Sequence, residues 1–247
     1  MTEGDLSGRV ALVTGAAHRL GAATARRLHA AGADVAIHYH RSRQAAEALA
    51  EELEAAAGGR ARAIGCALDD TANLGPLVES VAAALGGLDI LVNNAARFYP
   101  TPLAEVTEAH WDDLMATNLK APFFLAQAAA EHLAARGGCI VNLTDVYAER
   151  PLARHPVYSI SKAGVAMLTR TLAKEMGPAV RVNGVAPGAA LWPDAGLSEP
   201  DKEALLRHTA LGRSSGPEPI ADAVHFLATA DYITGQILGI EGGRLLY

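Results

Sequence analysis

Short runs of β-branched and other apolar residues alternate along the whole chain with longer stretches in which alanine and leucine recur at helical spacing. The runs that predict strands are Val10–Thr14, Asp34–Tyr39, Ala61–Cys66, Leu88–Asn93, Cys139–Thr144, Ala179–Val185 and Gln236–Ile240. The stretches that predict helices are Leu20–Ala31, Arg43–Ala57, Ala72–Leu85, Glu108–Ala135, Pro156–Met176 and Pro219–Thr229. This alternation is typical of βαβ units with right-handed crossovers. We predict an α/β fold, a doubly wound parallel sheet of about seven strands, in a single domain over residues 1–247.

Polar segments that contain glycine or proline directly follow several of the predicted strands. They are Thr14–Gly21, His38–Arg43, Asn93–Pro102, Asp145–Pro151 and Ala186–Pro193. A chain of 247 residues is also long enough for a TIM barrel, but that fold needs eight βα units. The strand pattern favours the doubly wound sheet, in which ligands bind at the carboxyl ends of the strands. The polar segments are therefore the predicted ligand site.

Composition and charge exclude several classes of protein. Apolar residues make up 50% of the chain and charged residues 19%, so a large core can form and disorder is excluded. The net charge of −6 argues against a nucleic-acid partner. The longest stretch without Asp, Glu, Lys or Arg, Val182–Pro193, is too short to cross a membrane. With no secretory signal and only Cys66 and Cys139, far apart, we expect a cytoplasmic protein.

The segment Thr14–Gly21 links the first predicted strand to a helix. Gly15 would allow a tight turn, and Gly21 would let the helix approach the strand. The free N–H groups of the helix would then face a pyrophosphate. Arg19 stands where such loops often have another glycine, and it adds a cation. The segment predicts a dinucleotide site, although a turn of this kind can also serve packing alone.

The second predicted strand ends in the sequence His38-Tyr39-His40-Arg41-Ser42, which contains no Asp or Glu. An acidic residue there would bind the ribose diol of NAD, whereas basic and hydroxyl groups suit the 2′-phosphate of NADP. A solvated strand end is the alternative interpretation. The two histidines could suggest a metal site, but Arg41 would repel a cation and no third ligand is evident, so we predict none.

Tyr158 and Lys162 lie four residues apart in a predicted helix, so their side chains share one face. An ammonium favours the charged form of a neighbouring phenol, which would lower the pKa of Tyr158 from about 10. Such a tyrosine could exchange a proton with a substrate. The same spacing is common on helices without function, so the pair needs support from other motifs.

That support comes from the order and spacing of several motifs: Thr14–Gly21, Asn93-Asn94-Ala95, Asn118, Tyr158 with Lys162, and Pro187-Gly188. Over essentially its whole length the chain resembles the short-chain dehydrogenases/reductases. The resemblance implies a Rossmann-type fold, a nicotinamide cofactor and a homotetramer. It implies that Asn118 holds a water of the proton relay, that Tyr158 is the acid and that Lys162 also binds the nicotinamide ribose.

The resemblance also implies a set of residues that hold the cofactor. They are Gly15, Arg19, Leu20, Gly21, His38, Tyr39, His40, Arg41, Ser42, Leu68, Asn94, Ala95, Ala96, Tyr158, Lys162, Pro187 and Gly188. Ala67 is a departure, because an aspartate that holds the adenine amine is usual at this position.

A second departure narrows the subfamily. Asp145 stands thirteen residues before Tyr158, where the family usually has a serine that holds a substrate carbonyl. Asp145, Arg19 and the segments at His38–Ser42 and Asn94–Pro102 resemble those of bacterial-type pteridine reductases. We expect burial to raise the pKa of Asp145.

The pteridine reductase resemblance also implies the substrate side of the site. The substrate residues would be Arg19, Phe98, Asp145, Tyr158 and Trp192. In this subfamily the pterin lies between the nicotinamide and a phenylalanine, here Phe98, although a loop anchor is the alternative. Trp192 would belong to a lid over the substrate, or else to a core or an interface.

The resulting hypothesis is an NADPH-dependent pteridine reductase. It would reduce dihydropterin to the tetrahydro form, with dihydrofolate and oxidised pterin as further candidate substrates. An NADPH-dependent carbonyl or 3-oxoacyl reductase is the nearest alternative. A non-catalytic NADP-binding interaction protein is a more distant one.

Overall fold

The computed structural model describes residues 5–56, 59–190, 196 and 198–247. Within these ranges a sheet of seven parallel strands has the order β3-β2-β1-β4-β5-β6-β7. The strands are β1 (Val10–Val13), β2 (Asp34–Tyr39), β3 (Ala61–Gly65), β4 (Ile90–Asn93), β5 (Cys139–Leu143), β6 (Arg181–Pro187) and β7 (Ile237–Ile240). Because the order reverses between β1 and β4, the predicted doubly wound sheet is confirmed.

Eight α-helices connect or follow these strands in the described part of the chain. They are α1 (Arg19–Ala30), α2 (Arg43–Ala55), α3 (Leu74–Leu85), α4 (Glu108–Met115), α5 (Ala121–Ala135), α6 (Pro156–Met176), α7 (Glu199–Arg207) and α8 (Glu218–Thr229). Among the described residues, none of these helices is both long enough and apolar enough to span a bilayer.

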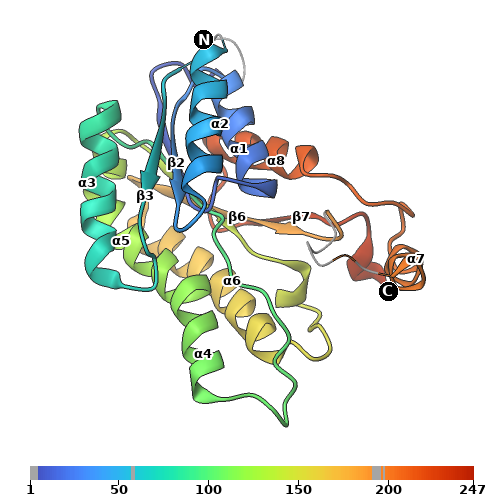
Figure 1. The fold of residues 1–247 in the computed structure, drawn as a ribbon. Coiled ribbons are helices and arrows are strands. Elements are labelled where there is room, and N and C mark those ends of the chain that lie inside the picture. Colours follow the sequence, from blue (N-terminus) through green and yellow to red (C-terminus); the bar gives the residue numbers. More distant parts are fainter. Residues whose placement is uncertain (1–4, 57–58, 191–195, 197) are drawn as a thin grey trace.

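The helices cover the sheet on both faces (Figure 1). On one face α1, α2 and α8 pack through residues such as Leu28, Leu53 and Val224. On the other face α3, α5 and α6 pack through residues such as Val78 and Leu125. Strands β1, β4 and β5 are buried along their whole length, which is why they have nearly continuous apolar sequences rather than alternating ones. This sandwich leaves the carboxyl ends of the central strands as the place for a ligand.

The prediction of one helix over Glu108–Ala135 is wrong at its centre. A π-helical turn, Ala116–Lys120, separates α4 from α5. The apolar pattern does not reveal this turn, because one wider turn barely changes the helical spacing of side chains. Asn118 lies in the turn and is buried there.

Helix α7 was not predicted. Its side chains are all at least partly exposed, so it lacks the apolar spacing that predicts a helix. The local signal is the cap, since the Ser198 hydroxyl accepts a hydrogen bond from the Asp201 N–H group. The predicted end of the second helix at Ala57 lies outside the described residues, and α2 ends at Ala55.

Candidate active site

The loop between β1 and α1 is shaped for close approach. Gly15 has a φ of +61°, which a glycine adopts without strain. A Cβ atom on Gly21 would lie 2.4 Å from the Gly15 carbonyl oxygen, so only glycine fits there. Arg19 also has a positive φ, +55°, a conformation that costs a non-glycine residue about 1–2 kcal/mol. The predicted tight turn is present, and Arg19 occupies a glycine-like position in it.

His38 holds this loop through a hydrogen bond and does not offer a positive charge to a ligand. Its Nδ1 atom accepts a hydrogen bond from the Gly15 N–H group (3.1 Å), so the proton is on Nε2, which donates to the Cys66 carbonyl oxygen (3.1 Å). Burial lowers the pKa of His38 to about 4, and the imidazole is neutral at physiological pH. His38 therefore positions Gly15, and the basic groups expected at the end of β2 reduce to His40 and Arg41.

The carboxyl ends of β1 and β4 are joined by side-chain hydrogen bonds. Asn94 donates from Nδ2 to the carbonyl oxygens of Thr14 (2.7 Å) and Gly15 (3.1 Å). The Thr14 hydroxyl accepts from the N–H groups of Asn94 and Ala95. Gly15, Asn94 and Ala95, together with Ala96, line the larger cavity described below.

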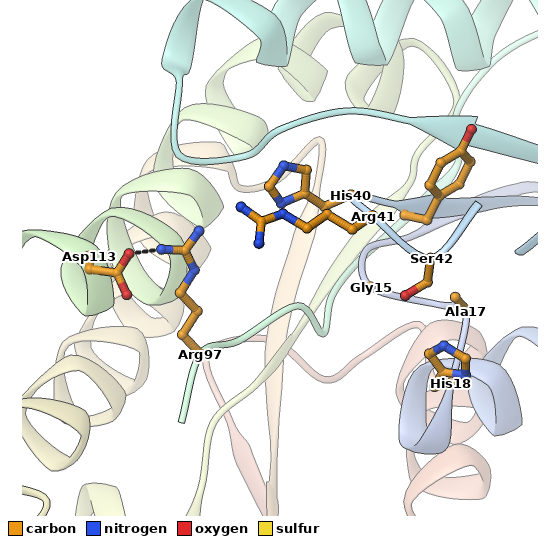
Figure 2. A pocket seen from close by; sticks show the side chains of 9 residues that line it. Gly15, Ala17, His18, His40, Arg41, Ser42, Arg97 and Asp113 are labelled. Atoms are coloured by element: carbon orange, nitrogen blue, oxygen red, sulfur yellow. Dashed lines mark ion pairs between the residues drawn. The ribbon is translucent and has the colours of Figure 1, made fainter. Parts of the chain in front are cut away.

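A smaller pocket of about 510 Å³ opens between the end of β2 and the start of α1 (Figure 2). Its lining includes His18, Tyr39, His40, Arg41 and Ser42. It therefore brings together the residues that the sequence assigned to the 2′-phosphate, other than His38.

Arg97 also lines this pocket and was missed by the sequence analysis. It is ion-paired with Asp113 of α4 and with Asp69 (3.0 Å). Figure 2 shows Arg97 and Asp113 on the side of the pocket opposite Gly15 and His18. Arg97 lies in the Asn94–Pro102 segment, but the sequence did not reveal its ion pairs, because the two partners are distant in sequence.

Tyr158, Lys162 and Asp145 lie together at the carboxyl end of β5. The Tyr158 hydroxyl donates a hydrogen bond to Asp145 Oδ2 (2.7 Å). The Lys162 ammonium donates to the Leu143 carbonyl oxygen (2.8 Å) and lies 5.8 Å from the centre of the Tyr158 ring. The second carboxylate oxygen of Asp145 accepts from the Tyr147 N–H group (2.9 Å), which caps the short helix Val146–Ala148. Helix α6 and the end of β5 thus deliver the predicted group of residues.

Phe98 lies beside this group. Its ring stacks on the His155 imidazole, with centroids 4.8 Å apart and an interplanar angle of 10°. It meets the Tyr158 ring nearly at right angles at 4.7 Å. Phe98 is 47% exposed, so it retains open aromatic surface. His155 was not identified from the sequence; its position three residues before Tyr158, at the start of α6, was the available signal.

One cavity of about 970 Å³ joins the loop, the group at Tyr158 and the segment after β6. Among the predicted residues its lining includes Gly15, Arg19, Leu20, Gly21, Leu68, Phe98, Asp145, Pro187 and Gly188. A Cβ atom on Gly188 would lie 2.7 Å from the Cα atom of Glu241, so glycine is required there. Ala67 brings no polar group to this region, whereas Asp69, two residues later, does line the cavity. Trp192 lies outside the described residues.

Comparison with known proteins identifies the family. Residues 15–244 match the family model described as enoyl-(acyl carrier protein) reductase. The chain is 38% identical to the 3-oxoacyl-[acyl-carrier-protein] reductase FabG of Staphylococcus aureus, with 96% of this chain and 98% of that protein covered. It is 34% identical to pteridine reductase 1 of Leishmania tarentolae, with 96% of each chain covered.

Solved structures agree. The crystal structure of a blue fluorescent protein from a metagenomic library, in complex with NADPH, superposes with a TM-score of 0.91 at 38% identity. The superposition covers 97% of this chain and 99% of that one. The chain belongs to the short-chain dehydrogenase/reductase family. It is accordingly an NAD(P)-dependent oxidoreductase with a Rossmann-like fold.

As in the short-chain dehydrogenase/reductase motif, Asn118 lies close to the active site, but its side chain is engaged with protein groups. Its Oδ1 atom accepts from the Arg97 N–H group (2.7 Å). Its Nδ2 group donates to the Arg97 carbonyl oxygen (3.0 Å) and to the Ser161 hydroxyl (3.0 Å). Asn118 therefore fixes the backbone next to Phe98, and its expected role with a relay water stays a prediction.

The prediction that the pKa of Tyr158 is lowered is wrong, because its pKa is raised in this short-chain dehydrogenase/reductase. Burial is the largest cause of a pKa well above 10, and the Asp145 charge and hydrogen bond raise it further. Burial lowers the pKa of Lys162 to about 8. Burial also raises the pKa of Asp145, as expected, against the opposing effects of its hydrogen bonds and of Lys162. Tyr158 is therefore a protonated phenol at neutral pH, which can give a proton.

We predict that Asp145→Asn lowers the pKa of Tyr158, because the substitution removes the negative charge that disfavours the phenolate. The measurement is a spectrophotometric titration of phenolate absorbance, with the Tyr158→Phe variant subtracted in each background. Glu149→Gln, at an exposed carboxylate nearby, serves as the control and should leave the titration unchanged. An unchanged Tyr158 titration in Asp145→Asn would mean that the carboxylate does not hold the phenol protonated.

Proposed function

We propose that this protein is an NADPH-dependent pteridine reductase that converts a dihydropterin to the tetrahydro form. The observation that carries the proposal is the hydrogen bond from Tyr158 to Asp145, in a cavity that is lined by Phe98. A carboxyl group beside the proton donor and an aromatic ring beside both suit a flat heterocycle that contains a C=N bond. The likeness to pteridine reductase 1 supports the same substrate class.

The residues present fit a dinucleotide phosphate. A Cβ atom at Gly21 would clash with the Gly15 carbonyl oxygen, so glycine at this position preserves the tight β1–α1 turn that such a ligand needs. The pocket of about 510 Å³ offers His40, Arg41 and Ser42 to a 2′-phosphate. When bound, NADPH supplies the hydride. The NADPH complex of the related blue fluorescent protein supports this choice of cofactor.

Asp145 separates imine from carbonyl reduction by charge. A carbonyl oxygen becomes negative as the carbonyl carbon accepts a hydride, and an ionised carboxylate next to that oxygen would oppose the charge. The nitrogen of a C=N bond is more basic than a carbonyl oxygen, so it can be protonated before or during hydride transfer and then carries no negative charge. The 2-amino and ring N–H groups of a pterin can also donate to a carboxylate. Asp145 therefore favours a pterin over a ketone.

The proton has a path through this chain's own side chains. Tyr158 releases its hydroxyl proton to the ring nitrogen next to the reduced carbon. Asp145, whose pKa is raised by burial, can take up a proton from water and return it to the phenolate. The Lys162 ammonium, 5.8 Å from the Tyr158 ring, stabilises the negative charge that passes through the phenol. The pair of Asp145 and Tyr158 thus acts as one donor.

The 3-oxoacyl reductase activity is the second candidate, because FabG of S. aureus is 38% identical to this chain. A non-catalytic NADP-binding protein is the third candidate, and a protein of that class needs no group such as Tyr158 with Lys162. A turnover assay separates all three.

We predict that the purified protein oxidises NADPH with dihydropterin, and faster than with 3-oxoacyl or simple ketone substrates. Asp145→Ser should lower pterin turnover about a hundredfold or more, as expected for loss of acid assistance, with NADPH affinity unchanged. The assay follows NADPH absorbance for each substrate. Turnover of ketones without turnover of pterins would contradict the proposal.

For the cofactor, we predict that Arg41→Ala weakens NADPH binding about tenfold or more, as a lost charge-assisted contact would, and barely changes NADH binding. Fluorescence titration of both cofactors gives the two dissociation constants. Arg26→Ala, at an exposed arginine paired with Glu52, is the matched control. Equal losses for NADPH and NADH would refute the role of Arg41 at the 2′-phosphate.

We also propose that the protein is a homotetramer. Phe123 and Phe124 on α5, and Ile160 and Met167 on α6, expose large apolar side chains that a second copy would cover. Sedimentation equilibrium should give a mass near four times 25.6 kDa. A mass of 25.6 kDa across the micromolar range would contradict this assembly.

A further inference from the structure

Phe98 is held by both of its neighbours in sequence. The Tyr99 hydroxyl donates a hydrogen bond to Asp113 Oδ2 (2.9 Å), and the Arg97 guanidinium is ion-paired with the same carboxylate. Asn118 also bonds both the N–H and the C=O group of Arg97. The residues on either side of Phe98 are therefore fixed to α4 and to the π-turn. These contacts do not fix the orientation of the Phe98 ring itself.

His155 contacts the ring directly. Its imidazole is almost parallel to the Phe98 ring, with centroids 4.8 Å apart. One face of Phe98 is consequently covered, so a flat ligand can stack only on the opposite face. Because Phe98 is 47% exposed, a large part of the ring is still available to such a ligand.

The imidazole is itself fixed in place. Its Nδ1 atom lies 2.9 Å from the Ala153 carbonyl oxygen. Although His155 precedes the first turn of α6, its side chain forms no capping hydrogen bond with the described residues of that helix. A role in helix capping therefore does not account for the histidine, whereas the ring contact with Phe98 does.

We propose that His155 is a positioning residue that holds the Phe98 ring as a platform for a flat heteroaromatic substrate. The inference deepens the proposed function and rests on its choice of a planar substrate. His155 acts by removing the freedom of the Phe98 side chain, so that less order has to be gained when the ligand binds. Its effect belongs to binding and not to the proton transfer, which Tyr158 and Asp145 carry.

The test compares His155→Ala, which removes the ring, with His155→Phe, which keeps a stacking ring. His132→Ala is the control, because His132 pairs with Glu79 on α3 and does not line the cavity. The probe is 2,4-diaminopteridine, titrated calorimetrically into each protein that has been saturated with NADP⁺. Steady-state kinetics with dihydropterin provide kcat and KM for the same variants.

We expect His155→Ala to raise the Kd of the probe and the KM for dihydropterin about three- to tenfold, the size of one aromatic pair. The value of kcat and the Kd of NADP⁺ should stay within about twofold, and His155→Phe should restore wild-type affinity. A merely structural role would instead lower the thermal stability and cofactor binding together.

Three results would overturn the inference: an unchanged probe Kd in His155→Ala, a His155→Phe variant as weak as the alanine variant, or a wild-type protein that does not bind the probe. Failure of the proposed function looks different. In that case the wild-type protein binds the probe, and His155→Ala weakens it, yet dihydropterin causes no oxidation of NADPH.

Discussion

The hydrogen bond between the Tyr158 hydroxyl and Asp145 sets the protonation of the whole site. Tyr158 is buried and Asp145 is partly buried, and burial disfavours the charged form of each. A carboxylate and a phenolate next to each other would repel, so Tyr158 keeps its proton and donates it in the hydrogen bond to Asp145. The Lys162 ammonium and the Arg244 guanidinium both favour the charged form of Asp145, and burial has brought the pKa of Lys162 to about 8. These opposing effects make Tyr158 a proton donor instead of the ready acceptor that a lysine neighbour alone would create.

The fold brings this pair together from two elements that follow each other in the chain. Asp145 comes two residues after the end of β5, and Tyr158 lies in the first turn of α6, which packs against the sheet beside β6. The same edge of the sheet carries the β1–α1 loop, because the carboxyl ends of parallel strands meet there. The β1–α1 loop and Tyr158 therefore line one cavity because of the strand order itself.

The features that depend on a local sequence pattern could be predicted from the sequence. Continuous apolar runs located the strands, and the spacing of Tyr158 and Lys162 located the helix that carries them. The prediction failed where the cause is a contact between distant residues. The neutral state of His38 comes from its burial, and its hydrogen bonds with Gly15 and Cys66 fix its tautomer. The ring stack of Phe98 with His155 joins two loops. The π-turn at Asn118 escaped for another reason, since a wider turn leaves the apolar spacing of a helix almost unchanged. The prediction of the site was therefore limited mainly by contacts between residues that are far apart in the sequence.

The two characterised types of relative show how little of such a fold decides its substrate. A 3-oxoacyl reductase and a pteridine reductase each align with 96% of this chain at 38% and 34% identity, so the sheet and the cofactor loop cannot distinguish them. The distinction has to lie in the few side chains that face the substrate. Next to the proton donor a hydroxyl group stabilises developing negative charge, whereas an ionised carboxylate at Asp145 would disfavour it. A ring such as Phe98 adds affinity only for a substrate that is flat. Overall sequence identity therefore says little about the substrate, which depends mainly on the charge and shape of the residues around Tyr158.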